Sequence, residues 1–375
     1  MKGRPEGCVR KRGPRFEAIL SVRGEDGRRR RPRRTFKTEP EAKKWLRAQL
    51  TALDVGAFVD PSKMTLGEHL TEWLEAIRHG IKLTTFASYK TMLEKHVVPR
   101  LGAKRLQAVT VPMLNLLYGE LRDAGLSPTS VRYVHVILHR AFSDAVLWER
   151  LVKNPATHAE VPVPSRREMR TWTAEEVVAF LNHVSDDRLY AAWYLAVMTG
   201  MRRSEVLGLR WSDVDWNGSR LQVQRGLVSV NYSKVVFSDL KNKRGRALDL
   251  DARTLAVLRE HRKRQMEEAA MLGPDREDQG LVFCRPEGSF IHPDRFGQMF
   301  KAHVRGAGVS GIRVHDLRHT WASLALQAGV HLKVVQERLG HSSISVTADT
   351  YSHVSQTMQR NAAEQVATLI LGAVG

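Results

Sequence analysis

Residues 199–205 read TGMRRSE, and the rest of the C-terminal part of the chain can be interpreted outward from this stretch. Gly200 predicts a turn that leaves Arg202 near the N-terminus of the following helix. A guanidinium beside the free N–H groups of a helix start is well suited to hold a phosphate. An ion pair between Arg202 and Glu205 on the protein surface explains the same pattern almost as well. Alone, the stretch is therefore a modest signal.

A second polar stretch reads HDLRHT over residues 315–320. His315 and Arg318 are three residues apart, so one face of a helix would present both. His315 and His319 are four apart, a spacing also found in zinc proteases. Those enzymes need a glutamate directly after the first histidine, and this chain has Asp316 there. A metal site is therefore not expected.

Two further stretches follow, LGHSSI at residues 339–344 and TYSH at residues 350–353. Each is a weak signal by itself. The four stretches together, in this order, resemble the signature of the tyrosine recombinases of the phage integrase family. The resemblance extends more loosely upstream, to that family's core-binding and arm-binding domains.

The resemblance implies a role for each matching residue. Tyr351 would attack the scissile phosphate, giving a 3′-phosphotyrosine and a free 5′-hydroxyl. Arg202 and Arg318 would bind the non-bridging oxygens, where negative charge develops. His315 would hydrogen-bond the phosphate and assist proton transfer at Tyr351, and His341 would donate to the same oxygens. Two guanidiniums take the place of a divalent metal and the covalent link conserves bond energy, so no metal and no cofactor is expected.

A lysine in a β-turn protonates the leaving 5′-oxygen in this family. The candidates here are Lys241 and Lys243, in the sequence LKNKRGR of residues 240–246. The family usually has Pro-Lys-Thr where this chain has Leu-Lys-Asn. We align Lys241 with the family lysine, and Lys243 remains the alternative.

The composition agrees with a polyanionic partner. The chain has 375 residues, a formal net charge of +19 and a calculated pI near 10.3. Such a balance on an enzyme-sized chain favours nucleic acid binding over a merely basic soluble protein. Cys8 and Cys284 are too far apart for a disulfide scaffold or a cysteine zinc site, and they fit a reducing cytoplasm. No signal peptide or membrane span is expected, so we predict a cytoplasmic protein.

Residues 1–60 are predicted to form a basic DNA-binding module. The first 50 residues carry seventeen basic and six acidic side chains. Residues 16–23 alternate like a half-exposed strand, residues 24–27 suggest a hairpin turn and residues 28–36 a basic strand. Thr38 would be the N-cap of a helix, giving a three-stranded sheet with one helix. The predicted DNA contacts are Arg28, Arg29, Arg30, Arg31, Arg33 and Arg34. A flexible basic tail is the alternative.

The remaining organisation follows from hydrophobic periodicity and breakers. Residues 64–155 are predicted to be helical, with Pro99 among the residues that separate the helices, and the resemblance makes them a SAM-like core-binding domain. Residues 156–169 are interpreted as a linker. Residues 170–375 form the predicted catalytic domain, with a helix after Thr173 and strands near 221–224, 235–237 and 247–250. The fold class is mainly α with small β elements, an α+β multidomain architecture.

The function implied is a site-specific DNA recombinase that integrates or excises a phage or mobile element. The expected partner is double-stranded DNA at attachment sites, bound by a homotetramer, with a DNA-bending host factor and an excisionase as candidate accessory proteins and no membrane. An apolar helix at residues 364–374 would either cap its own domain or dock into a neighbouring subunit. The alternatives are a type IB topoisomerase-like enzyme and a DNA-binding relative that has lost catalysis.

Overall fold

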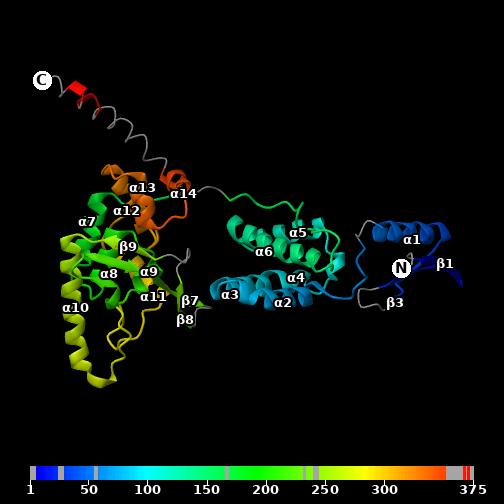
Figure 1. Ribbon diagram of the computed structural model, residues 1–375, viewed down its shortest axis with the longest axis horizontal. Coiled ribbons are helices and arrows are strands. Elements are labelled where there is room, and N and C mark those ends of the chain that lie inside the picture. Colours follow the sequence, from blue (N-terminus) through cyan, green and yellow to red (C-terminus); the bar gives the residue numbers. More distant parts are fainter. Residues whose placement is uncertain are drawn as a thin grey trace. The chain divides into compact units, whose positions relative to one another are not determined.

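The computed structural model describes residues 6–23, 29–54, 58–164, 169–230, 234–239, 245–351, 366–368 and 370–371. The chain divides into two compact units, Met1–Arg166 and Arg167–Gly375 (Figure 1). Within the described ranges, no helix is both long and apolar enough to cross a membrane.

The first unit begins with a small sheet covered by one helix. The strands are β1 (Glu6–Arg12), β2 (Arg15–Arg23), β3 (Arg29–Arg30) and β4 (Arg33–Phe36), and β2 pairs antiparallel with each of the others. The inward side chains of β2, Ala18, Leu20 and Val22, pack in one apolar cluster with Ala42 and Leu46 of helix α1 (Glu39–Asp54). The predicted alternation holds for Ala18, Leu20 and Val22, but Glu17, predicted to face outward, is also buried and pairs with Arg10 and Arg12.

The sheet has four strands where the sequence predicted three. The predicted strand of residues 28–36 is split by Arg31 and Pro32, because proline has no N–H to donate to a strand ladder. The Pro32 carbonyl still accepts from the backbone N–H of Leu20 at 2.9 Å, so both pieces stay on β2. Helix α1 starts directly after Thr38, as predicted. The proposed turn at residues 24–27 and Arg28 lie outside the described residues.

The rest of this unit is helical. Its elements are α2 (Leu66–Ile77), α3 (Leu83–Met92), the π-helical turn η2 (Leu93–Val97), α4 (Val98–Leu101), α5 (Val111–Asp123) and α6 (Pro128–Leu147), with short 3-10 turns at Arg78–Gly80 and Leu106–Ala108. Trp73, Tyr118 and Phe142 are among the largest buried side chains of their common core. The Thr65 hydroxyl accepts from the backbone N–H of Glu68, which fixes the start of α2.

Pro99 does not end a helix, contrary to the sequence prediction. Helical backbone continues from α3 through the π-helical turn into α4, and Pro99 lies inside α4. A proline ring clashes with the carbonyl four residues earlier in a regular α-helix. The wider π turn directly before it changes that spacing, so the helical run continues.

The start of the predicted linker at residues 156–169 is packed against the helical core. Pro155 is buried and Ala156 has no exposed surface. The backbone N–H of Glu160 donates to Asn115 Oδ1 at 2.9 Å. The chain is therefore anchored to the helices as far as residue 160.

The second unit is a helical domain with short strands. Its helices are α7 (Ala174–His183), α8 (Tyr190–Thr199), α9 (Arg203–Leu207), α10 (Ala252–Leu272), α11 (Pro293–Gly306), α12 (Asp316–Gln327), α13 (Leu332–Leu339) and α14 (Ile344–Tyr351), with 3-10 turns at Trp211–Asp213 and Gly273–Asp275. Strands β5 (Val214–Asp215), β6 (Arg220–Val223) and β9 (Arg246–Asp249) form one sheet, and β7 (Arg225–Val230) and β8 (Lys234–Asp239) form a hairpin. The predicted helix after Thr173 is present and has a complete capping box with Glu176.

Helix α8 is the centre of this unit. Nearly all its side chains are buried, including Trp193, whose ring stacks on Phe296 of α11 with centroids 4.2 Å apart. Helices α10 and α12 also contact α8. A helix that is apolar on all sides has no solvent-facing stripe, and burial on every side is what such a sequence requires.

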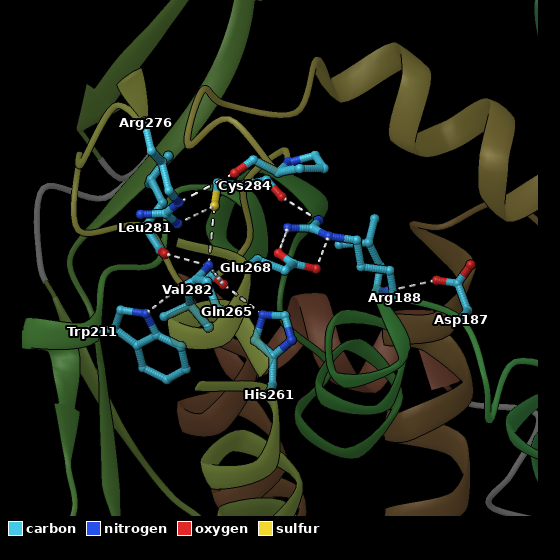
Figure 2. Close-up of polar contacts among 12 residues, drawn as sticks. Asp187, Arg188, Trp211, His261, Gln265, Glu268, Arg276, Leu281, Val282 and Cys284 are labelled. Carbon is cyan, nitrogen blue, oxygen red and sulfur yellow. Dashed lines mark hydrogen bonds and ion pairs between the residues drawn. The ribbon is translucent and has the colours of Figure 1, made fainter. Parts of the chain in front are cut away.

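A polar cluster fixes α10 to the rest of the unit (Figure 2). Arg188 makes a two-pronged contact with Glu268 of α10, at 2.8 and 2.6 Å, and donates a third bond to the carbonyl of Cys284 at 2.7 Å. One helical turn earlier, Gln265 donates to the carbonyls of residues 281 and 282 and accepts from Trp211 Nε1. Neighbouring polar groups thus satisfy one another, which makes this cluster a structural fastening.

Candidate active site

Four of the six predicted catalytic residues lie at helix ends that meet near the C-terminus of α8. Gly200 ends α8 in the left-handed conformation, with φ +62°, and Arg202 becomes the N-cap of α9, as the sequence predicted. A Cβ on Gly200 would lie 2.9 Å from Leu339 at the end of α13. Glycine therefore allows the chain to turn and α13 to approach.

Arg318 ties two of these helix ends together. It lies in the first turn of α12 and only 2% of its surface is exposed. Its guanidinium donates to the carbonyl of Gly200 at 3.0 Å and to the carbonyl of Leu339. A planar guanidinium bound to fixed carbonyls on both sides is held in one orientation.

Arg202 forms the ion pair that was the alternative interpretation of its sequence pattern. Its Nη1 lies 2.7 Å from Glu205 Oε1, and its backbone N–H donates to the other carboxylate oxygen at 2.9 Å. Glu205 is buried, whereas 28% of the Arg202 side chain stays exposed. The pair is thus buried on the acidic side, and it leaves Arg202 accessible to a ligand.

A second arginine contacts the carboxylate of Glu205. Arg246, at the start of β9, donates to Glu205 through Nη1 at 3.0 Å and Nη2 at 2.7 Å. Burial alone would raise the pKa of Glu205, but the hydrogen bonds and charge of Arg246 and the charge of Arg202 together lower this pKa to about 2. Two cations on one carboxylate leave a net positive charge at this position.

The two predicted histidines face the same charges. His315 is the N-cap of α12, three residues before Arg318, and its ring lies edge-to-face with that of His319. Burial first, and then the charges of His319, Arg318 and Arg202, lower the pKa of His315 to about 4. The imidazole is therefore neutral at neutral pH, with one nitrogen that can donate and one that can accept.

His341 follows α13 and is supported from α14. Its Nδ1 lies 2.8 Å from the Thr347 hydroxyl. Burial, followed by the charges of Arg318 and Arg202, lowers the pKa of His341 to about 4. Arg202 and Arg318 are thus within electrostatic reach of both His315 and His341.

The other two predicted residues are described less fully. Tyr351 is the last residue of α14, which contacts α13, and its side chain lies outside the described part of the chain. Lys241 and Lys243 lie outside the described residues, in the connection between β8 and β9. Among the side chains that the structure describes, no group of three could hold a metal ion.

Sequence analysis assigned no role to Arg246 and Thr347. Arg246 is the last residue of LKNKRGR, the stretch that contains the two candidate lysines. A basic residue at the first position of a short strand was the available signal. Its acidic partner is 41 residues away in the sequence, so the pairing was not visible. Thr347 lies six residues after His341, in a stretch without an obvious motif.

Comparison with protein families gives two matches. The model described as the phage integrase family matches residues 170–358, half of the chain, and the phage integrase N-terminal SAM-like domain matches residues 65–115. The chain is 29% identical to a tyrosine recombinase XerC-like protein of Caldanaerobacter subterraneus subsp. tengcongensis, over 96% of this chain and 98% of the relative. It is 25% identical to the ICEBs1 integrase of Bacillus subtilis, over 76% and 78% of the two chains.

Solved structures share the fold. The Tn1549 transposon integrase in complex with transposon right end DNA matches with a TM-score of 0.68 and 20% identity, over 81% of this chain and all of the other. A lambda integrase dimer bound to a core site matches with a TM-score of 0.60 and 17% identity, over 92% and 94%. These neighbours support the mainly helical α+β architecture expected from the sequence.

Proposed function

The chain belongs to the phage integrase family of site-specific DNA recombinases, which break and rejoin DNA, and on that premise we propose that Tyr351 is its nucleophile. The tyrosine oxygen would attack the scissile phosphorus and displace the 5′-oxygen of the next nucleotide. The product is a 3′-phosphotyrosine and a free 5′-hydroxyl. Attack by a 5′-hydroxyl of a partner strand reverses the step and releases Tyr351, so strands are exchanged without an external energy source.

Arg202 and Arg318 are proposed to bind the non-bridging oxygens of that phosphate. The observation that carries this proposal is the convergence of both guanidiniums with His315 and His341 at one set of helix ends. Charge builds on the non-bridging oxygens in the transition state, and donors that are already fixed stabilise it without reorganisation. Arg318 is held by two carbonyls and Arg202 by Glu205, so both meet this requirement.

The histidines are proposed to act as neutral hydrogen-bonding groups in the free enzyme. If the Thr347 hydroxyl donates to Nδ1 of His341, the ring keeps an N–H at Nε2 that can donate to a phosphate oxygen. His315, also neutral, can accept the proton of the Tyr351 hydroxyl during attack. A bound phosphate brings negative charge and favours the protonated form that this transfer produces.

Lys241 is proposed as the acid that protonates the leaving 5′-oxygen, with Lys243 as the alternative. A 5′-phosphorothiolate substrate tests this directly, because its sulfur leaves without needing a proton. We expect Lys241→Ala to cleave the ordinary substrate slowly and the sulfur substrate at the wild-type rate. The same rescue in Lys243→Ala, and none in Lys241→Ala, would reassign the role.

We propose that three modules divide catalysis and DNA binding between them. Residues 170–375 hold the chemistry, residues 64–155 would bind the core site, and residues 1–60 would bind separate arm sites through Arg28, Arg29, Arg30, Arg31, Arg33 and Arg34. The last five of these arginines are exposed on or beside the short strands β3 and β4. Deleting residues 1–55 should spare core-site binding and abolish binding to distant sites. Normal recombination of a complete attachment site by the deleted protein would reduce this module to a nonspecific tail.

The assembly proposed is a homotetramer on two DNA duplexes, acting in the cytoplasm with a DNA-bending factor and an excisionase as accessory partners. The apolar segment 364–374 is proposed to dock into a neighbouring subunit. Most of it lies outside the described residues, and Val366 and Ile370 are exposed where they are described. Truncation after Arg360 should leave single-site binding intact and impair synapsis. Tetrameric synapses and normal recombination by the truncated protein would exclude the docking role.

The central experiment is Tyr351→Phe on a nicked duplex that carries the recombination site. The wild-type protein should form a covalent DNA adduct, and Tyr351→Phe should bind the same duplex equally well without forming one. An adduct in Tyr351→Phe would move the nucleophile elsewhere. No adduct in the wild type would favour a relative that has lost catalysis, and adducts with relaxation but no strand exchange would favour a topoisomerase-like enzyme.

A further inference from the structure

Arg246 makes a set of contacts that the proposed chemistry does not yet use. Only 12% of its side chain is exposed. Nη1 and Nη2 donate to the two oxygens of Glu205, at 3.0 and 2.7 Å, and Nε donates to the carbonyl of Arg338 at 2.8 Å. Three of its five N–H groups therefore bind protein acceptors, which points to a supporting role within the protein.

These acceptors belong to two different helices that carry parts of the candidate active site. Glu205 is on α9 and also binds the side chain of Arg202. Arg338 is near the end of α13, next to Leu339, whose carbonyl accepts from Arg318. One side chain on β9 thus connects the support of Arg202 with the support of Arg318.

The same side chain reaches the loop that carries His341. Gly340 ends α13 in the left-handed conformation, with φ +68°, and a Cβ on it would lie 3.2 Å from Cδ of Arg246. The charge of Arg246 also contributes to the lowered pKa of His341, after burial and the charges of Arg318, Arg202 and His319. The position of His341 is therefore tied to that of Arg246 by packing as well as by charge.

We propose that Arg246 is a positioning residue that sets the geometry of Arg202 and His341 relative to the scissile phosphate. It keeps Glu205 ionised and fixed in orientation, so that Glu205 can orient Arg202, and it holds the end of α13 in place. This inference rests on the proposed function of the site. An error of about 1 Å in such a group costs on the order of 10²-fold in rate, so a residue that contacts no substrate can still control cleavage.

Arginine is required here because of its shape. A lysine keeps the positive charge but offers a single ammonium, which cannot make a two-pronged contact and bind a carbonyl on a different side. Arg246→Lys should therefore keep the fold and only part of the cleavage rate. If Arg246→Ala does not fold, the cleavage rate of Arg246→Lys still tests the inference.

The matched control is Arg188. Like Arg246, it makes two hydrogen bonds to a carboxylate and one to a backbone carbonyl in the same unit, here to Glu268 and Cys284, although the carboxylate is bound by Nε and Nη2. Glu268 contacts none of the proposed catalytic residues in the described part of the chain. A purely structural role would therefore make Arg246→Ala and Arg188→Ala behave alike.

The experiment measures single-turnover adduct formation on the nicked duplex, DNA affinity and thermal unfolding for each variant. We expect Arg246→Ala to form adduct about 10- to 100-fold more slowly, with DNA affinity nearly unchanged. Arg246→Lys should recover part of the rate. Arg188→Ala should lose stability and keep the wild-type rate at temperatures where it is folded.

The pH profile of adduct formation gives a second readout. Loss of Arg246 removes the hydrogen bonds that lower the pKa of Glu205 most, while burial and Arg202 remain, so this pKa should rise. The acidic limb of the rate profile should then move to higher pH in Arg246→Ala and stay in place in Arg188→Ala. Protonation of His315 and His341 would also lower the rate at acidic pH. Arg246→Ala is therefore compared with Arg246→Ala/Glu205→Gln, which has no carboxylate to titrate at position 205. The share of the pH shift that is due to Glu205 should be absent from this double variant.

Each result decides the inference. Wild-type rate and profile in Arg246→Ala, with normal adduct in the wild type, would overturn the positioning role and leave the proposed function intact. A rate loss in Arg246→Ala that merely follows its unfolding, as in Arg188→Ala, would overturn it as well. Absence of any Tyr351-dependent adduct in the wild type would overturn the proposed function and, with it, this inference.

Discussion

Two arginine–glutamate contacts in the second unit have the same kinds of hydrogen bond and different surroundings. Arg188 binds Glu268 through Nε and Nη2 and a backbone carbonyl through Nη1, whereas Arg246 binds Glu205 through Nη1 and Nη2 and a backbone carbonyl through Nε. Among the described side chains, Glu268 forms a direct ion pair with Arg188 alone, and Arg276 acts on it only through its charge. Glu205 contacts Arg202 as well, and the positive charge is in excess.

The difference shows that contact geometry alone does not indicate a role. A balanced pair that is about a third exposed on both sides adds modest stability and fixes one helix. A carboxylate that is fully buried between two arginines costs more to desolvate, and it leaves cationic groups facing a common point. The number of arginines that contact the carboxylate distinguishes a structural ion pair from a binding site.

The largest effect is expected when the arginines are replaced without loss of charge. Arg202→Lys and Arg318→Lys should each lower the rate of adduct formation by about 10²–10³, because an ammonium cannot reproduce a two-pronged contact with phosphate. Arg188→Lys should leave this rate unchanged. A nicked-duplex cleavage assay compares them, and near-normal cleavage by either active-site variant would show that the phosphate ligands are wrongly assigned.

The second expected effect is on the pH dependence of stability. His315 and His341 have pKa values near 4 in the folded protein, below the ordinary value of 6.5. Between these values the unfolded chain takes up protons that the folded chain does not, so the stability present above pH 6.5 is lost as the pH falls toward 4. Thermal unfolding without DNA should show this loss, and the double variant His315→Gln/His341→Gln should show less of it.

The Arg188 pair should respond in a different pH range. Its hydrogen bonds and charge lower the pKa of Glu268 from 4.5, so the stability that the pair contributes is present above pH 4.5 and is lost only below it. Glu268→Gln should therefore leave the loss between pH 6.5 and 4.5 unchanged. If Glu268→Gln flattened that loss as much as the histidine variant, the histidines would not be its main source.

A smaller effect is expected from removing the Arg188–Glu268 pair itself. Arg188→Ala should lower the free energy of unfolding by about 1–2 kcal/mol, because it leaves a partly buried carboxylate and a carbonyl without their donor. Denaturant unfolding measures this difference. A loss as large as that expected for a fully buried ion pair, about 3–5 kcal/mol, would mean that the site is drier than its exposure indicates.

The smallest effect is expected from an arginine–carboxylate pair on the surface. Arg220 Nε lies 2.6 Å from Asp249 Oδ1, with 56% and 73% of the two side chains exposed. Arg220→Ala should change the free energy of unfolding by less than about 0.5 kcal/mol. Equal losses in Arg220→Ala and Arg188→Ala would remove the distinction between an exposed and a partly buried pair.

Local sequence signals predicted the elements that local interactions decide. The helix predicted after Thr173 is present, and strand β6 covers nearly the range expected from its apolar residues. Gly200 and Arg202 lie at the turn and helix start predicted for them. Each of these features depends on residues only a few positions apart.

The features that sequence analysis missed depend on other parts of the chain. Strand β5 has only two residues and exists because β6 pairs with it. The continuous helical backbone through Pro99 depends on a π-helical turn that no residue pattern predicts. The role inferred for Arg246 depends on Glu205 and Arg338, which reach it only after the sheet and α13 have packed.

The buried carboxylate of Glu205 has a further consequence for the energy of the free protein. Arg202 and Arg246 are brought together during folding around this one acid, while Arg318 is held by backbone carbonyls, and the mutual repulsion of these cations opposes the folded state. A phosphodiester is the missing counter-charge, so DNA should act as a stabilising ligand of the second unit in addition to being its substrate. The repulsion that weakens the unliganded fold is thus released at the moment of binding, and screening by salt should reduce both the weakness and its relief.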